Sequence, residues 1–127
     1  MFLIDTEPVL RYLLDDDGKA ADEIAKTILN EEVYITTEVL VQVVESLQND
    51  HGVPRTSIAN ALLQLLGEIR QLDAPVAIEA ILTYENTELD FTDCVLYARC
   101  RRTGARLLTF DAALKNKLGG SMNENDV

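Results

Sequence analysis

Short apolar runs alternate along this chain with longer segments whose apolar residues recur at helical spacing. The first run, residues 1–4, stops at Asp5, and a second, Val33–Thr36, leads into an amphipathic segment of helical period. Short apolar strands are typical of a buried parallel sheet, in which helices connect one strand to the next. The alternation therefore predicts an α/β fold with a mostly parallel sheet, whose ligands bind outside the carboxyl ends of the strands.

The same pattern predicts the order of the elements. We expect strands at residues 1–4, 33–36, 69–72 and 106–110, and helices at residues 8–14, 20–29, 37–49, 75–86, 91–103 and 112–118. A further helix starts near Pro54, with an apolar face that extends to Ile69. The run Arg106–Phe110 is the clearest strand, and Asp15–Gly18 breaks the first helical region. We expect residues 1–118 to form a single domain and residues 119–127, which have little to bury, to form a flexible tail.

The charge balance restricts the ways in which the chain could bind nucleic acid. It has 11 Lys plus Arg and 22 Asp plus Glu, a formal net charge of −11. A broad basic surface is therefore excluded, although bound divalent cations can supply positive charge locally. Arg11 is one basic feature suited to RNA phosphates. The other is a cluster that we interpret as a solvated helix end, formed by Arg99, Arg101, Arg102 and Arg106.

Histidine and cysteine usage exclude further classes. His51 is the one histidine, and we interpret it as structural or solvated, which disfavours a Ser-His-Asp type of hydrolase. Cys94 and Cys100 lie in one predicted helix, so we expect two reduced, buried thiols and a cytoplasmic protein. No apolar stretch approaches the roughly 20 residues of a membrane span, so we expect no membrane association.

Three aspartates suggest a site. Asp5 and Asp111 directly follow predicted strands, and Asp93 opens the helix before the last strand. If these strands are neighbours, the carboxylates converge, and such a cluster either keeps a proton or binds a cation such as Mg²⁺ or Mn²⁺. Each aspartate could instead be a helix cap or a first-turn acid. Asp90 fits the cap position better than Asp93, which leaves Asp93 available for a cation.

Three segments resemble signatures of the PIN-domain proteins, especially the small VapC-type ribonuclease toxins. They are Ile4–Thr6 followed by Leu10–Leu14, then Leu89–Asp93, and then Leu108–Asp111. Their order and spacing agree with that family, as does Gly52–Pro54. The resemblance implies a three-layer α/β/α sandwich that cleaves RNA with one or two Mg²⁺ or Mn²⁺ ions. It also implies a homodimer and a toxin that a cognate antitoxin protein neutralises.

Carried over residue by residue, the resemblance assigns the metal site to Asp5, Asp93 and Asp111. Thr109 matches a hydroxyl position near them. Gln42 stands where the family has a catalytic glutamate, and glutamine keeps a coordinating oxygen without the charge. The chain is therefore interpreted as a metal-dependent endoribonuclease, or alternatively as a weakened or inactive PIN domain that acts as a binding or regulatory protein.

Auxiliary roles fall to residues near these positions. They are Thr6, Glu7, Glu45 and Glu38. Glu7 stands where the family usually has Asn or Ser, and it also fits a first-turn helix acid. Glu38 and Glu45 lie one turn of helix from Gln42 on either side, and the favoured interpretation of both is a solvated polar stripe on that helix. A phosphoacceptor signalling domain ranks below these readings, because Asp5 has no adjacent acidic partner and no predicted strand is followed by a suitable lysine.

Overall fold

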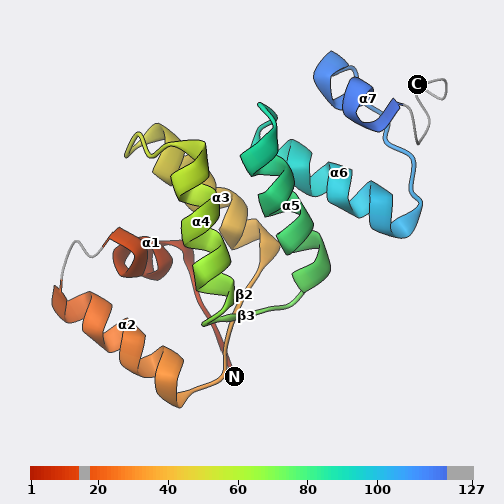
Figure 1. Ribbon diagram of the computed structural model, residues 1–127. Helices are drawn as coiled ribbons and strands as arrows, with labels where there is room; N and C mark the ends of the chain where they lie inside the picture. Colours follow the sequence, from red (N-terminus) through yellow and green to blue (C-terminus); the bar gives the residue numbers. More distant parts are fainter. Residues whose placement is uncertain (15–17, 120–127) are drawn as a thin grey trace. The chain divides into compact units, whose positions relative to one another are not determined.

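The computed structural model describes residues 1–14 and 18–119 and contains the alternation of strands and helices that the apolar pattern predicts (Figure 1). The strands are β1, Phe2–Leu3; β2, Val33–Ile35; and β3, Arg70–Gln71. The helices are α1, Thr6–Leu14; α2, Gly18–Asn30; α3, Thr37–Asn49; α4, Arg55–Leu66; α5, Ala74–Asn86; α6, Phe91–Thr103; and α7, Ala112–Gly119. The predicted break at Asp15–Asp17 lies outside the described residues, as does the predicted tail beyond Gly119, which ends α7.

The three strands form one parallel sheet in the order β1-β2-β3. Helices α1 and α2 connect β1 to β2, and helices α3 and α4 connect β2 to β3. Tyr34 of β2 lies opposite Arg70 of β3, whose guanidinium lies 6.0 Å from the Tyr34 ring centroid and 3.1 Å from Glu32. This arrangement confirms the α/β class with a parallel sheet.

Local sequence signals explain where the helices begin and end. The Thr36 hydroxyl caps α3 by accepting a hydrogen bond from the Val39 N–H at 3.3 Å. Asp90 caps α6 in the same way, and Gly104 ends it in the left-handed conformation (φ 75°), which glycine adopts without strain. The apolar face of α3 is buried as predicted, through Leu40, Val43, Val44 and Leu47.

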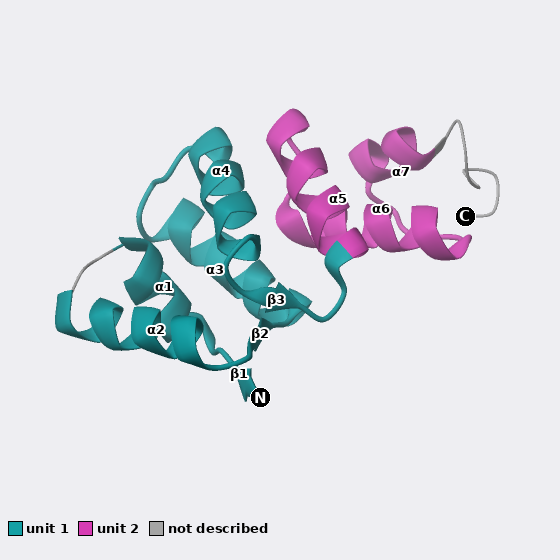
Figure 2. Ribbon diagram, turned by 60° about the horizontal axis from the view of Figure 1, so that its bottom comes forward, with its two compact units in different colours: residues 1–74 teal, residues 75–127 magenta. Residues whose placement is uncertain are grey.

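The chain forms two compact units, residues 1–74 and residues 75–127 (Figure 2). In the first unit, α1 packs against α2 and α3, α3 packs against α4, and β2 is the central strand of the sheet. In the second unit, α6 packs against α7, and the rings of Tyr84 and Phe91 meet edge to face at 5.7 Å. Cys94 and Cys100 are both buried, as predicted, and they are not joined by a disulfide. The prediction of a single domain over residues 1–118 stays a prediction.

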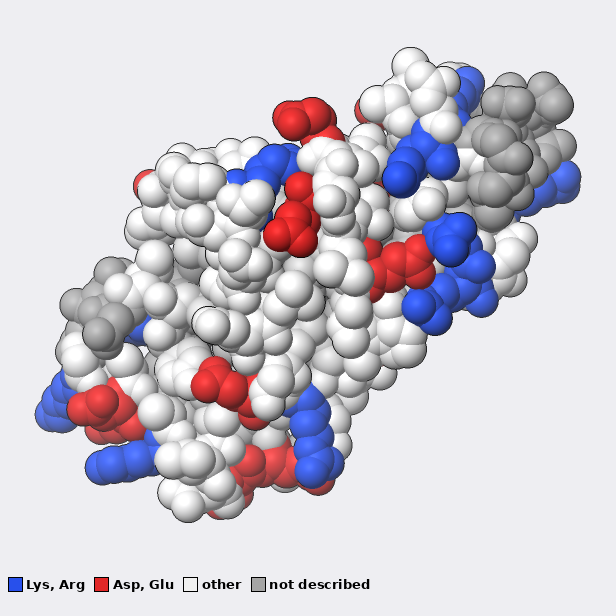
Figure 3. All heavy atoms as spheres, viewed as in Figure 1, with Lys and Arg blue, Asp and Glu red and all other residues white. Residues whose placement is uncertain are grey.

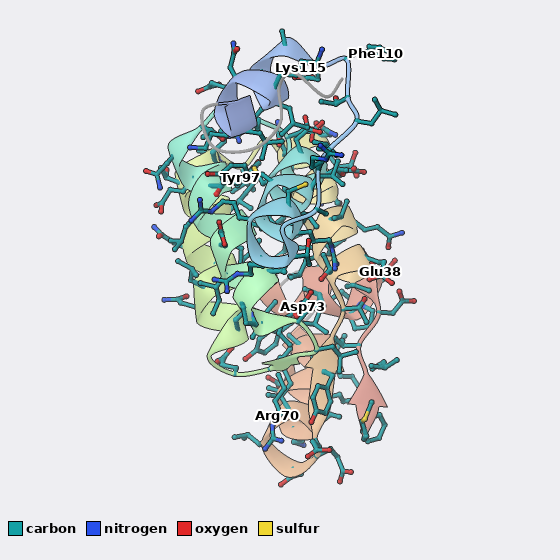
Figure 4. The ribbon with its side chains drawn as sticks, turned by 90° about the vertical axis from the view of Figure 1, so that its right-hand side faces the viewer. Glu38, Arg70, Asp73, Tyr97, Phe110 and Lys115 are labelled. Atoms are coloured by element: carbon teal, nitrogen blue, oxygen red, sulfur yellow. The ribbon has the colours of Figure 1, made fainter. Side chains whose placement is uncertain are left out.

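Two expectations about strands are wrong. The first strand is not buried, since Phe2 and Leu3 are 48% and 59% exposed, because in the described residues β1 pairs on one side only. Arg106–Phe110 is not a strand: Leu108 and Phe110 are 76% and 93% exposed, and the Phe110 side chain extends away from the ribbon (Figure 4). A strand requires a neighbour for its backbone hydrogen bonds, and the strand pairs of the described residues do not include Arg106–Phe110.

A helix that crosses a membrane must be long and apolar. Over residues 1–14 and 18–119, none of the helices combines the length and apolar character that a bilayer span requires.

Candidate functional site

Asp93 lies in the first turn of α6, beside the residue that caps this helix. Asp90 Oδ1 accepts a hydrogen bond from the Asp93 N–H at 2.9 Å, which confirms that Asp90 rather than Asp93 is the cap. The Asp93 side chain is half-buried. Burial raises its pKa above the ordinary value of 3.8, and the negative charges of Asp90 and Asp111 raise it further. A bound cation would reverse this effect, because positive charge favours the ionised carboxylate.

Asp111 occupies the position before α7 and acts as the cap of that helix. Its Oδ1 accepts a hydrogen bond from the Leu114 N–H at 2.8 Å, and its own N–H donates to the Thr109 hydroxyl at 3.1 Å. Thr109 thus contacts the backbone of Asp111, and its predicted role near a metal site stays a prediction. Because the charge of Asp111 acts on Asp93, the structure brings these two aspartates into electrostatic contact.

In the first unit, Thr6 makes a hydrogen bond to Asp5 and another to Gln42, and so links these two residues. Asp5 Oδ1 accepts a hydrogen bond from the Thr6 N–H at 2.7 Å. The Thr6 hydroxyl donates to Gln42 Oε1 on α3. Sequence reasoning named Thr6 as auxiliary but missed this contact, because 36 residues separate its partners and no local pattern connects them. Thr6 thus orients the amide oxygen of Gln42 at the N-terminal end of α1.

The other auxiliary residues have simpler surroundings. Glu7 forms an exposed ion pair with Arg11 at 3.3 Å, one helical turn away on α1, so each partly neutralises the other. Glu38 and Glu45 are exposed on α3, as expected for a polar stripe. His51 is exposed just beyond α3, which agrees with a solvated histidine.

A cleft of about 500 Å³ opens next to Asp5 in the first unit. Its walls come from β1, α1 and α2, and its lining is largely apolar, including Leu3, Ile24 and Ile28. Asp5, Glu7 and Arg11 also line it.

The oxygen donors in each unit fit a hard divalent cation in their chemistry. Carboxylate and amide oxygens are the ligands that Mg²⁺ and Mn²⁺ prefer. Within the described residues, however, no three or more His, Cys, Asp or Glu side chains form a group that could hold a metal ion. Asp5 and Gln42 belong to residues 1–74, and Asp93 and Asp111 belong to residues 75–127. The structure thus gives two partial sets of ligands.

Comparison with known proteins identifies the class. The sequence matches the PIN domain family over residues 2–117, a match that extends over both compact units. The chain belongs to the PIN domain family. PIN domains are generally nucleases, and they typically act with divalent metal ions. Among curated proteins, none matches this sequence.

Proposed function

We propose that this chain is a metal-dependent endoribonuclease that hydrolyses RNA phosphodiester bonds. The observation that carries this proposal is the environment of Asp93, whose pKa is raised by burial and by two neighbouring carboxylates in a chain of the PIN family. A cation bound beside Asp93 and Asp111 would offset the repulsion between their charges. Asp93 and Asp111 are the proposed ligands in the second unit, and Asp5 is the proposed ligand in the first.

The roles of the protein groups follow from their contacts. Mg²⁺ or Mn²⁺, when bound, would polarise the phosphate and make a water more acidic. Asp93 and Asp111 supply charged oxygen atoms, and Thr109 restrains the backbone next to Asp111 through its hydroxyl. Thr6 orients Gln42, which offers a neutral oxygen. The chain then needs no histidine as an acid or base, which suits a sequence with one exposed histidine.

The biological setting is also part of the proposal. The VapC-like order of the three sequence segments supports a toxin that acts on RNA in the cytoplasm, that forms a homodimer and that a cognate antitoxin protein neutralises. The apolar cleft beside Asp5 offers a surface on which an antitoxin segment could bind.

A cleavage assay tests the activity. The purified chain is incubated with a varied RNA pool in Mn²⁺ or in EDTA, and the products are resolved by length. We expect fragments with Mn²⁺ only, and a loss of at least about a hundredfold in rate for Asp93→Asn, as is common when a group that stabilises charge in the transition state is removed. Asp22→Asn on α2, which is exposed, is the matched control. Intact RNA with the wild-type chain in Mn²⁺ would refute the ribonuclease proposal.

Gln42 favours a second candidate function, a PIN domain with weakened or absent catalysis that acts by binding. The neutral amide should bind a cation less tightly than the glutamate of the resembling family. Gln42→Glu is therefore expected to raise Mn²⁺ affinity about tenfold, equivalent to about 1.4 kcal/mol, as measured by calorimetry. Gln64→Glu, an exposed position on α4, controls for the added charge. If Gln42→Glu binds Mn²⁺ tightly and still leaves RNA intact, the binding function replaces the catalytic one.

A further inference from the structure

Positive charge is concentrated in one part of this acidic chain. Six of its 11 Lys and Arg residues lie between residues 99 and 117, where Asp111 is the only acidic residue. This stretch forms the C-terminal half of α6, the linker after it and most of α7, and the two helices pack together. Figure 3 shows blue side chains gathered over this region on the face that it draws. Favourable interaction with the helix dipoles accounts for cations in the last turns of α6 and α7, but it does not account for their gathering at one place.

Contacts around Tyr97 assemble cations from both helices. The Arg101 guanidinium carbon lies 5.7 Å from the Tyr97 ring centroid, and the Lys117 ammonium lies 5.3 Å from it. The half-buried ring therefore keeps one cation of α6 and one of α7 near each other (Figure 4 labels Tyr97).

One carboxylate restrains two of the arginines without neutralising the group. Glu79 of α5 contacts Arg101 Nε at 2.6 Å and Arg102 Nε at 3.1 Å. Each contact uses one of the five N–H donors of a guanidinium, and both arginine side chains remain about half exposed (50% and 48%). Arg101, Arg102 and Lys117 are thus three cations, and Glu79 pairs with the first two of them, so a net positive surface remains. We name Tyr97, Arg101, Arg102 and Lys117 the α6–α7 basic surface.

The position of this surface connects it to the proposed chemistry. Asp93, Tyr97 and Arg101 follow one another at four-residue intervals, so they lie on the same side of α6. A nucleic-acid strand that Arg101 binds would thus run along the side of α6 that carries Asp93. Asp93 lies one helical turn from Tyr97 on that side. Arginine recognises phosphate through its planar fork, and single-stranded nucleic acid is commonly held by cations placed next to an aromatic ring.

We propose that the α6–α7 basic surface binds the sugar–phosphate backbone of single-stranded RNA and directs it along α6 toward Asp93. This inference rests on the proposed ribonuclease function. A basic surface can bind RNA or an acidic protein segment, and the proposed function is the reason that we name RNA. On a chain of net charge −11, most of the surface repels RNA, so binding depends on this local excess of positive charge.

Binding is measured separately from cleavage. Fluorescence anisotropy follows a short labelled single-stranded RNA titrated with the full chain in EDTA, over a series of salt concentrations. The test variant is Arg102→Gln with Lys117→Gln, which leaves Glu79 paired with Arg101. The control is Lys19→Gln with Lys26→Gln on α2, two exposed positions that lose the same charge. Circular dichroism checks that each variant is folded, and Lys117→Gln alone is used if the double variant is not.

The expected result is specific to the surface. The test variant should bind RNA about tenfold more weakly at low salt, and its log–log salt slope should fall by about 1.4, since each phosphate contact of a single strand contributes about 0.7. The control variant should match the wild type. Equal losses in both variants, or no RNA binding by the wild type, would overturn the proposal. So would a polyglutamate chain that competes as well as RNA, since that outcome would indicate an acidic protein partner.

The same variants separate this proposal from the function on which it rests. RNA that binds through the surface but is not cleaved in Mn²⁺ supports the surface and refutes the ribonuclease. Cleavage by the test variant at the wild-type rate, with RNA below saturation, supports the ribonuclease and refutes the surface.

Discussion

At the scale of the single residue, Asp93 is an acid whose surroundings oppose its ionisation. Burial is the largest cause of its raised pKa, followed by the charges of Asp90 and Asp111 and by a side-chain hydrogen bond with Asp90. Such an environment lowers the stability of the folded chain when no cation is bound. The same negative charges attract a cation when it binds. Asp93 therefore links the stability of the fold to the proposed metal site.

The raised pKa of Asp93 predicts a pH-dependent effect of Asp93→Asn. Between the ordinary value of 3.8 and the higher folded value, the folded state binds more protons than the unfolded state. The free energy of unfolding therefore decreases as pH rises through that window and stays lower above it. Without metal at pH 7, Asp93→Asn should raise the melting temperature by about 2 °C.

This stabilisation should shrink as the pH falls toward about 4, close to the ordinary pKa of aspartate. Thermal unfolding followed by circular dichroism at several pH values measures it, with Asp22→Asn as the control. A melting temperature of Asp93→Asn that stays below that of the wild type at pH 7 would show that the carboxylate stabilises the fold instead.

At the scale of the element, α6 depends on its cap. Asp90 supplies the side-chain oxygen that satisfies the Asp93 N–H, which the helix itself cannot pair. Asp90→Ala should lower the free energy of unfolding by about 1 kcal/mol, whereas Asp90→Asn should preserve most of it, because asparagine caps as well as aspartate. Urea unfolding measures both. A loss for Asp90→Asn as large as that for Asp90→Ala would contradict the capping role and indicate that the charge matters.

Signals of this local kind explain which elements could be predicted from the sequence. The bounds of α3 and α6 agree with the prediction, because each has a capping residue in front and a regular apolar face. Arg106–Phe110 could not be placed correctly in this way. Its apolar run is typical of a buried strand. A strand, however, forms only where a second strand lies beside it, and the sequence of five consecutive residues does not show whether such a partner exists.

For the candidate site too, local sequence signals could predict some features and not others. Asp90 could be identified as a cap from its position before a predicted helix. The grouping of Asp93 with Asp111 depends in the sequence on a strand at Arg106–Phe110, which the structure does not contain. The Thr6 contact with Gln42 and the gathering of Arg101 and Lys117 at Tyr97 could not be identified, because each joins separate elements through side chains. The excess of Lys and Arg over residues 99–117 was visible, although the last turn of α6 explains only part of it.

At the scale of the whole molecule, the proposed metal ligands divide between the two compact units. Asp5 belongs to residues 1–74 and Asp93 to residues 75–127. If both carboxylates bind the same ion, the loss of either one should weaken Mn²⁺ binding, and the second loss should matter less once the first ligand has gone. If each unit binds an ion alone, the two losses should be independent.

A double-mutant cycle decides between these outcomes. Mn²⁺ affinity is measured by calorimetry for the wild type, Asp5→Asn, Asp93→Asn and the double variant, at one ionic strength. A shared ion predicts that each single variant binds at least about tenfold more weakly, and that the two effects fail to add by at least about 0.5 kcal/mol, the usual lower bound for residues in contact. Asp5→Asn with Asp22→Asn provides the additive reference. Additive losses for Asp5 and Asp93 would mean that the units hold metal separately, and a single metal site built from both would then be ruled out.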